Sequence, residues 1–177
     1  MKKKVIASLI TVGLISPLFG ANSAHAYGLF TSSDCPKVSH PKDIYYWVDG
    51  RFQNYSGKWT EVTESVNKWD ALSEVEFTKR VDLPGGADIK VEYGDFFNGD
   101  LYGKYFLGSR GNTIIYKKWF ELTATEERET VVHEVGHALG LKHTQETNDS
   151  ISVMRQYGFN NKDYPLSDDK AGIAAHY

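Results

Sequence analysis

The sequence predicts an α+β domain in which one sheet is covered by two long helices. Runs of β-branched and aromatic residues, which are typical of strands, recur between residues 44 and 117. Two longer segments, residues 60–72 and about 124–139, instead place apolar residues at the spacing of one helix face. The second helix follows the last strand and carries a cluster of histidines, so we expect the functional residues there.

The first 26 residues have the three parts of a secretory signal peptide. Three lysines follow Met1, an apolar run extends from residue 5 to about residue 19, and residues 24–26 read Ala-His-Ala. A membrane anchor is disfavoured, because the run is interrupted by proline and glycine and is shorter than the ~20 residues that span a bilayer. We expect cleavage after Ala26 and a secreted, extracellular chain that starts at Tyr27.

The composition predicts one acidic domain with a single thiol. Removing 26 of the 177 residues leaves 151, a common size for one domain. The three leader lysines reduce the 20 basic residues to 17, against 23 acidic ones, for a net charge of −6. Such a chain has no electrostatic reason to bind nucleic acid or an anionic membrane. With Cys35 as its one cysteine it forms no internal disulfide, and we expect a monomer.

Local patterns divide the rest of the chain into a lead and one domain. Residues 27–42 are polar and carry two prolines, so we expect an extended lead, or a short pro-segment, outside the core. Residues 43–177 form the domain. Its predicted strands are residues 44–48, 75–81, 87–93 and 112–117, with a helix at 60–72, a turn at 84–86 and a loop at 94–111.

The second long helix has a clear start signal. Thr123 and Glu126 have the spacing of a capping box, and Glu126 and Glu127 suit the positive end of the helix dipole. The helix then runs to about Leu139, with enough valine, alanine and leucine to bury it against the sheet. Burial makes such a helix a rigid support for functional side chains.

Residues 133–143 read HEVGHALGLKH. His133 and His137 are four residues apart, so their imidazoles leave one helix face about one turn apart and can bind one zinc ion. Gly140 tolerates the left-handed backbone of a helix end, where the chain can turn and bring back His143 as a third nitrogen. Three protein ligands leave the fourth tetrahedral position for water, which is typical of catalytic zinc sites.

Glu134 is about 100° round the helix from His133, where it could take a proton from a zinc-bound water without binding the metal. The short pattern HExxH also occurs by chance in helices whose histidines are ordinary surface or core residues. The addition of Gly140 and His143 at the correct spacing disfavours that explanation.

The extended motif, followed by Ser152-Val153-Met154, resembles the metzincin clan of zinc peptidases. Within the clan, the order of elements from about residue 43 to residue 177 is similar to that of the matrixin-like secreted peptidases. The resemblance implies a twisted, mostly parallel sheet with an antiparallel edge strand, two long helices of which one carries the zinc ligands, and a C-terminal helix. Residues 166–177 resemble that closing helix.

By this resemblance, Met154 forms a floor beneath the imidazoles and is not a zinc ligand. Tyr157 lies three residues after Met154, whereas clan members that use a tyrosine near the metal place it two after. We therefore interpret Tyr157 as a wall of the substrate pocket. Residues 155–165 would border the primed-side pocket, which accepts the side chain after the scissile bond.

The histidines limit the number of metal ions. Vertebrate-type matrixins hold a second, structural zinc with histidines in the loop before the edge strand, but residues 94–111 contain none. We expect one catalytic zinc per chain. Calcium could bind to Asp82, Asp88, Asp95 or Asp100, although aspartates are also common in ordinary turns.

The lead could regulate the site. In matrixin-like enzymes a segment before the catalytic domain can place a cysteine or an acidic side chain on the zinc and keep the enzyme latent. Asp34 or Cys35 could do this here, with Cys35 favoured as the softer ligand. The surrounding SSDCPKV does not match the family's cysteine-switch motif, and the alternative is an unpaired thiol in a flexible tail.

Together these residues predict a secreted zinc endopeptidase that hydrolyses protein substrates with Glu134 as general base. An extended substrate would lie along the edge strand, which we expect near residues 112–117. One alternative is a secreted zinc-binding module or decoy without turnover, which has no need of Glu134. Another is a zinc hydrolase that acts on a non-peptide amide or ester.

Overall fold

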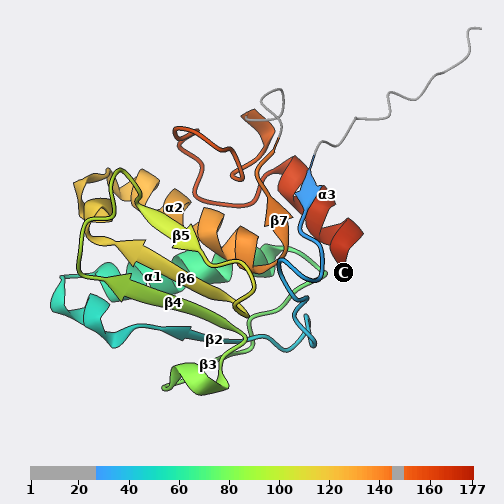
Figure 1. Ribbon diagram of the computed structural model, residues 1–177, viewed down its shortest axis with the longest axis horizontal. Helices are drawn as coiled ribbons and strands as arrows, with labels where there is room; N and C mark the ends of the chain where they lie inside the picture. The colour runs from blue at the N-terminus through green and yellow to red at the C-terminus, as the bar shows by residue number, and fades with distance from the viewer. Residues whose placement is uncertain (1–26, 145–149) are drawn as a thin grey trace, which may run out of the picture.

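The computed structural model describes residues 27–144 and 150–177, so the predicted signal peptide lies outside the described residues. A five-stranded sheet forms its centre (Figure 1). The sheet has the order β3-β2-β4-β6-β5, and only β5 is antiparallel to its neighbour. This confirms the predicted α+β class with an antiparallel edge. The strands are β2 (Tyr45–Val48), β3 (Lys79–Arg80), β4 (Ile89–Gly94), β5 (Gly103–Tyr105) and β6 (Asn112–Tyr116).

The central strands follow the predicted alternation. In β4, Ile89, Val91 and Tyr93 are buried on one side, as expected, while Glu92 between them is exposed. The looser pattern at residues 75–81 produces only the two-residue strand β3, because the preceding residues make scattered backbone bonds to residues 41 and 44 in place of a ladder.

Two predictions about the sheet edge were wrong. The edge strand is β5, which lies inside the segment predicted as a loop, and β6 lies between β4 and β5. An extended substrate could therefore not pair with β6, because β4 and β5 already occupy its two sides, and Lys117 lies beyond the strand in a 3-10 helix. Sequence pattern missed β5 because the strand has only three residues and a single buried side chain, that of Tyr105.

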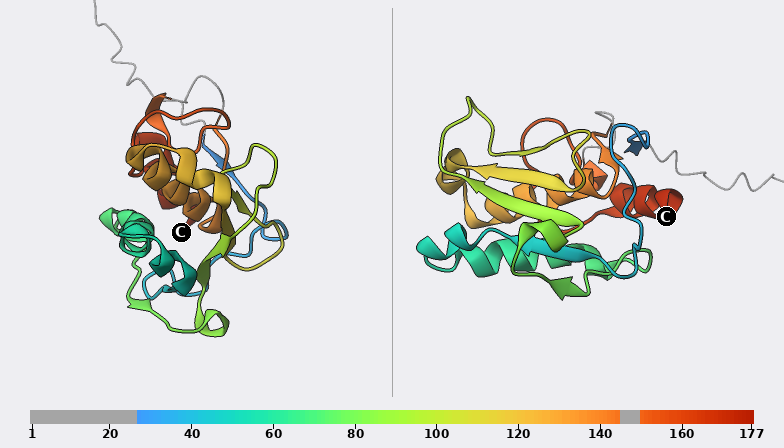
Figure 2. Two further views of the ribbon diagram at one scale, coloured as in Figure 1. Left: turned by 90° about the vertical axis from the view of Figure 1, so that its left-hand side faces the viewer. Right: turned by 60° about the horizontal axis from the view of Figure 1, so that its bottom comes forward.

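Helices α1 (Lys58–Val66) and α2 (Ala124–Ala138) pack together on the same face of the sheet (Figure 2, left). The predicted apolar face of the first helix is buried, although its last turns form a 3-10 helix at Asn67–Ala71. The predicted capping box at Thr123 and Glu126 is present at the start of α2.

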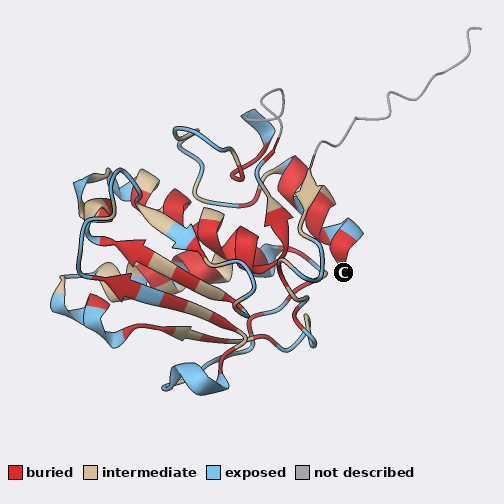
Figure 3. Ribbon diagram, viewed as in Figure 1, coloured by how far each residue is buried: buried red, intermediate tan, exposed pale blue. Residues whose placement is uncertain are grey.

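Two tryptophans fix α2 in the core. The indole N–H of Trp69 donates to the carbonyl of Val132 at 3.2 Å, and that of Trp119 donates to the carbonyl of Glu127 at 2.7 Å. Both rings are fully buried, and buried residues continue along α2 and the strands in front of it (Figure 3). The helix is therefore held along its length by the sheet and by α1.

The lead is part of the core, contrary to the prediction. Strand β1 (Gly28–Leu29) pairs antiparallel with β7 (Leu141–Lys142), the short strand that follows α2. Cys35 and Val38 are buried members of the hydrophobic core. The prediction failed because the polar residues of the lead are exposed while these few apolar ones point inward, a pattern too short to recognise in sequence.

Helix α3 (Ser167–His176) is the predicted closing helix, and it packs beside β1 and β7 (Figure 1). The lead and the C-terminal helix therefore meet at the end of α2. Within residues 27–144 and 150–177, every helix is too short or too polar to cross a membrane.

Candidate active site

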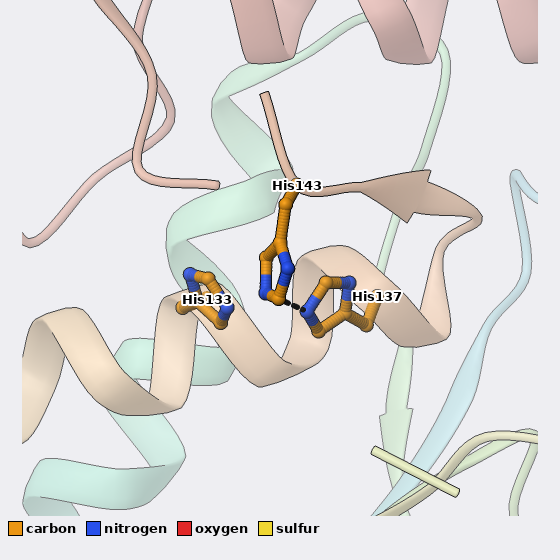
Figure 4. Close-up of side chains that lie close together, drawn as sticks. All are labelled: His133, His137 and His143. Atoms are coloured by element: carbon orange, nitrogen blue, oxygen red, sulfur yellow. Dashed lines mark hydrogen bonds between the residues drawn. The ribbon is translucent and has the colours of Figure 1, made fainter. Parts of the chain in front are cut away.

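Helix α2 presents His133 and His137 one turn apart, with ring centroids separated by 4.7 Å (Figure 4). Both Nδ1 atoms lie 2.7 Å from a backbone carbonyl, that of Val153 for His133 and that of Leu141 for His137. Because a carbonyl only accepts, each Nδ1 atom carries the proton. Each Nε2 atom is left with a lone pair for a metal.

His143 reaches the same point from the segment after α2. Gly140 has a φ of 106° and turns the chain into β7, which ends just before His143. The Nε2 atom of His143 lies 3.2 Å from that of His137, and the ligand atoms of all three histidines lie within 4.8 Å of one another. Two nitrogens on a tetrahedral zinc would be about 3.3 Å apart, so the three side chains fit one ion.

The histidines are electrically suited to a cation. Burial lowers the pKa of His133 to about 4 and lowers that of His137 well below the ordinary value. Burial also lowers the pKa of His143. All three imidazoles are therefore neutral at pH 7, which is the form that binds a metal.

Glu134 lies beside the histidines as a buried carboxyl group, with 7% of its surface exposed. Burial raises its pKa to about 8, although the backbone N–H of Tyr105 opposes the shift by donating to the carboxylate. A bound cation would lower that pKa and favour the ionised form. The carboxylate is not among the grouped ligand atoms, but it lines the same cleft as the three histidines.

A turn at residues 152–154 supports the histidines from below. Met154 is buried, and a methyl group added at Gly136 of α2 would lie only 2.4 Å from its Sδ atom, so the thioether lies directly against the helix. Asp169 of α3 holds this turn by accepting from the hydroxyl of Ser152 at 2.5 Å and the N–H of Val153 at 2.9 Å. The predicted floor is thus tied to the C-terminal helix.

The sequence profile of the matrixin family matches residues 40–177. The chain belongs to the matrixin family. It is accordingly a zinc metalloendopeptidase of the metzincin type. A search of curated proteins finds no match. The solved structure of myroilysin is similar in fold, with a TM-score of 0.56 and 16% sequence identity, and the alignment covers 84% of this chain and 97% of that chain.

The histidines of this matrixin open into a cleft of about 1090 Å³. Tyr157 lies at its rim with 76% of its surface exposed, and residues 155–159 form part of its wall. The edge strand β5 also borders the cleft. The structure therefore places Tyr157 on the cleft without enclosing it in a pocket.

Sequence reasoning missed Glu129, which is buried on α2 and also lines the cleft. Its carboxylate accepts the backbone N–H of Asn160 at 2.9 Å and that of Lys162 at 3.1 Å. Burial raises the pKa of Glu129, although these two bonds oppose the shift. The spacing could have revealed this residue, because it precedes His133 by four positions and so shares its helix face.

The structure does not bring the proposed latency ligands to the histidines. Cys35 is 98% buried from solvent, and its Sγ atom lies 3.5 Å from the carbonyl oxygen of His137, on the main chain of the helix end. Asp34 accepts from the hydroxyl of Thr31 at 2.8 Å. Within the described part of the chain, the only metal-ligating group found is the histidine triad.

The four aspartates considered for calcium are dispersed. Asp82 pairs with Arg80, Asp88 accepts from the N–H of Tyr45, Asp95 pairs with Lys117, and Asp100 pairs with Lys118. Each carboxylate thus has its own protein partner. They form no metal-binding group in residues 27–144 and 150–177, and nothing in the site requires calcium.

Proposed function

We propose that this matrixin is a secreted endopeptidase that cleaves extended protein substrates, with Glu134 as the general base. The observation that carries the proposal is the convergence of three neutral imidazoles beside one buried carboxylate in an open cleft. His133, His137 and His143 would hold one zinc per chain, with Met154 as their floor and Gly140 as the turn. When bound, zinc supplies a water of lowered pKa and polarises the carbonyl of the substrate.

Glu134 performs the proton transfers in this proposal. Its carboxylate accepts a proton from the attacking water and later donates it to the amine that leaves. Its place in the cleft favours this role, because the buried carboxyl group lines the same cavity as the three histidines and would be ionised beside a bound cation. Removing such a base typically costs about 10²–10⁴-fold in rate.

The edge strand β5 is the proposed substrate platform. It is the last strand of the sheet, so its outer edge has no neighbouring strand. Gly103, Lys104 and Tyr105 all line the cleft. An extended peptide can add to such an edge through backbone hydrogen bonds. Because backbone bonding makes little demand on side chains, we expect a broad range of unfolded or extended protein substrates. Secretion after cleavage at Ala26 and a monomeric state are part of the same proposal.

The experiment compares the chain from Tyr27 to Tyr177 with its Glu134→Ala variant. We expect both proteins to hold one zinc, and only the unaltered chain to cleave casein. A metal content near two would contradict the single site. Zinc binding without cleavage by the unaltered chain would instead favour a zinc-binding decoy, and turnover of simple esters but not casein would favour a non-peptide hydrolase.

A further inference from the structure

The C-terminal end of α2 is capped by residues from far away in the chain. The last carbonyls of a helix have no partner within it. Here Cys35 lies with its thiol 3.5 Å from the carbonyl of His137 and 3.7 Å from that of Ala138. The hydroxyl of Tyr177 donates to the carbonyl of Leu139 at 3.2 Å. The N–H of Phe30 donates to the carbonyl of Gly140 at 2.9 Å.

These capped residues form the connection between two zinc ligands. The chain from His137 to His143 must turn at Gly140, and the carbonyl of Leu141 in that turn holds the Nδ1 atom of His137. Strand β1 pairs with residues 141–142 directly before His143. The lead therefore fixes the segment that sets the distance between the two imidazoles.

Side chains of the lead also contact the ligands and the C-terminus. The ring of Phe30 packs against the imidazole of His137, with centroids 5.7 Å apart, and borders the cleft. The backbone N–H of Val38 binds the hydroxyl of Tyr177, so one hydroxyl joins the lead, the C-terminus and the end of α2. Cys35 is closed off by this packing and faces main-chain carbonyls.

We propose that residues 28–38 and Tyr177 form a fixed cap on the zinc helix that positions His143, and that the lead is not a removable pro-segment. This inference rests on the proposed zinc site, because it assigns the cap a role in metal affinity. Groups that hold the zinc ligands in place without binding the metal themselves typically change the zinc affinity by about 10–100-fold when they are removed. Loosening the cap should widen the range of His137–His143 distances and weaken zinc binding.

The test uses the chain from residue 27 to residue 177 and measures zinc affinity by competition with a chromophoric chelator. Cys35→Ala removes the thiol, Tyr177→Phe removes the hydroxyl, and a double variant removes both. We expect the double variant to bind zinc about 10–100-fold more weakly, with smaller losses for each single variant. Cys35→Ser, which keeps a donor, should bind zinc more tightly than Cys35→Ala.

Tyr46→Phe is the matched control. Tyr46 is a buried tyrosine whose hydroxyl accepts from Asn67 at 3.2 Å, in β2 and away from the end of α2. It should lower the unfolding temperature without changing zinc affinity. If the double variant does not fold, the two single variants carry the comparison.

Two results would refute the proposed role of the cap in zinc binding. One is a zinc affinity that is the same in the unaltered chain and in the Cys35 and Tyr177 variants. The other is faster peptide cleavage by Cys35→Ala at unchanged zinc affinity, which would identify the thiol as an inhibitory ligand. Failure of the unaltered chain to bind zinc would refute the proposed function itself, and the two failures are therefore distinguishable.

Discussion

Gly103 of the edge strand lies directly against Glu134 of the zinc helix. A β-carbon at position 103 would stand 2.8 Å from Cγ of Glu134 and 3.1 Å from its Oε1 atom. The edge strand approaches the carboxylate this closely only because residue 103 has no side chain. The position of the proposed base is thus set from outside its own helix.

We expect Gly103→Ala to displace the Glu134 carboxylate and to slow peptide hydrolysis by about 10²-fold, because small misplacements of a catalytic group have large effects. Zinc content should not change, since the histidines are untouched. The check is kcat for a quenched peptide together with metal analysis. Gly85→Ala, where nothing lies within 4 Å of the added methyl group, should retain full activity. Full activity of Gly103→Ala would show that this contact does not position the base.

A second close approach fixes the floor of the site. A β-carbon at Gly136 would lie 2.4 Å from Sδ of Met154 and 2.9 Å from the ring of Trp69. Replacing glycine by alanine inside a helix ordinarily stabilises a protein by about 0.5–1 kcal/mol. Here we expect the opposite sign, a loss of about 1–3 kcal/mol in the free energy of unfolding, because overpacking dominates.

Urea unfolding of the metal-free protein measures this loss. Met154→Ala removes the Sδ atom that the added methyl group would meet. The loss of stability in the double variant should therefore be smaller than the sum of the losses in the two single variants. Simple additivity would mean that the helix and the methionine turn are not in contact.

The zinc ligands could be predicted from sequence because their geometry is local. Helical spacing fixes His133 and His137, and one glycine allows the turn to His143. The supports of these residues could not be predicted in the same way. The carbonyl of Val153 binds His133 from 20 residues away. Asp169 in turn holds the N–H of Val153 from 16 residues away. No periodicity encodes such a pairing.

The edge of the sheet and the lead show the same limit. Strand β5 has only three residues, and its pairing with β6 depends on register and not on its own pattern. The chemistry of Cys35 allows a latency ligand and its polar surroundings suggest a thiol in a flexible tail, whereas its place in the fold follows from packing against the end of α2. Short segments acquire their structure from the surfaces that they cover.

Glu129 provides a third prediction. Its buried carboxylate holds residues 160 and 162 and thereby the cleft wall before them. Glu129→Leu leaves two backbone N–H groups without this acceptor, so we expect a loss of about 1–3 kcal/mol in the free energy of unfolding. Because this wall lines the proposed substrate cleft and supplies none of the three histidines, KM should rise more than kcat falls.

Steady-state kinetics with a series of peptides separates the two constants. Glu129→Gln keeps one accepting oxygen and should lie between Glu129→Leu and the unaltered chain. A large fall in kcat with unchanged KM would instead indicate that Glu129 acts on the reacting groups.

Asp49 carries the pH prediction. The residue is buried, with 5% of its surface exposed. Its carboxylate accepts from the guanidinium of Arg51 and from the backbone N–H of Tyr93 at 3.2 Å, and so ties the end of β2 to β4. Burial alone would raise its pKa, but the bonds from Arg51 and Tyr93 outweigh burial and lower it. A pKa below the unfolded value means that the ionised carboxylate stabilises the fold near neutral pH. This stabilisation is lost as the pH falls through the lowered value.

We therefore expect Asp49→Asn to reduce the free energy of unfolding by about 1–3 kcal/mol at pH 7. The loss should be smaller at pH 3, because this pH lies below the ordinary pKa of 3.8, so the unfolded chain binds a proton at Asp49 that the native carboxylate resists. Urea unfolding at the two pH values measures the difference. Glu92→Gln is the matched control, because Glu92 contacts the same guanidinium at 3.3 Å with its side chain 53% exposed. Glu92→Gln should lower the free energy of unfolding by less than about 1 kcal/mol at both pH values. An equal loss for Asp49→Asn at pH 3 and pH 7 would assign the effect to shape and not to charge.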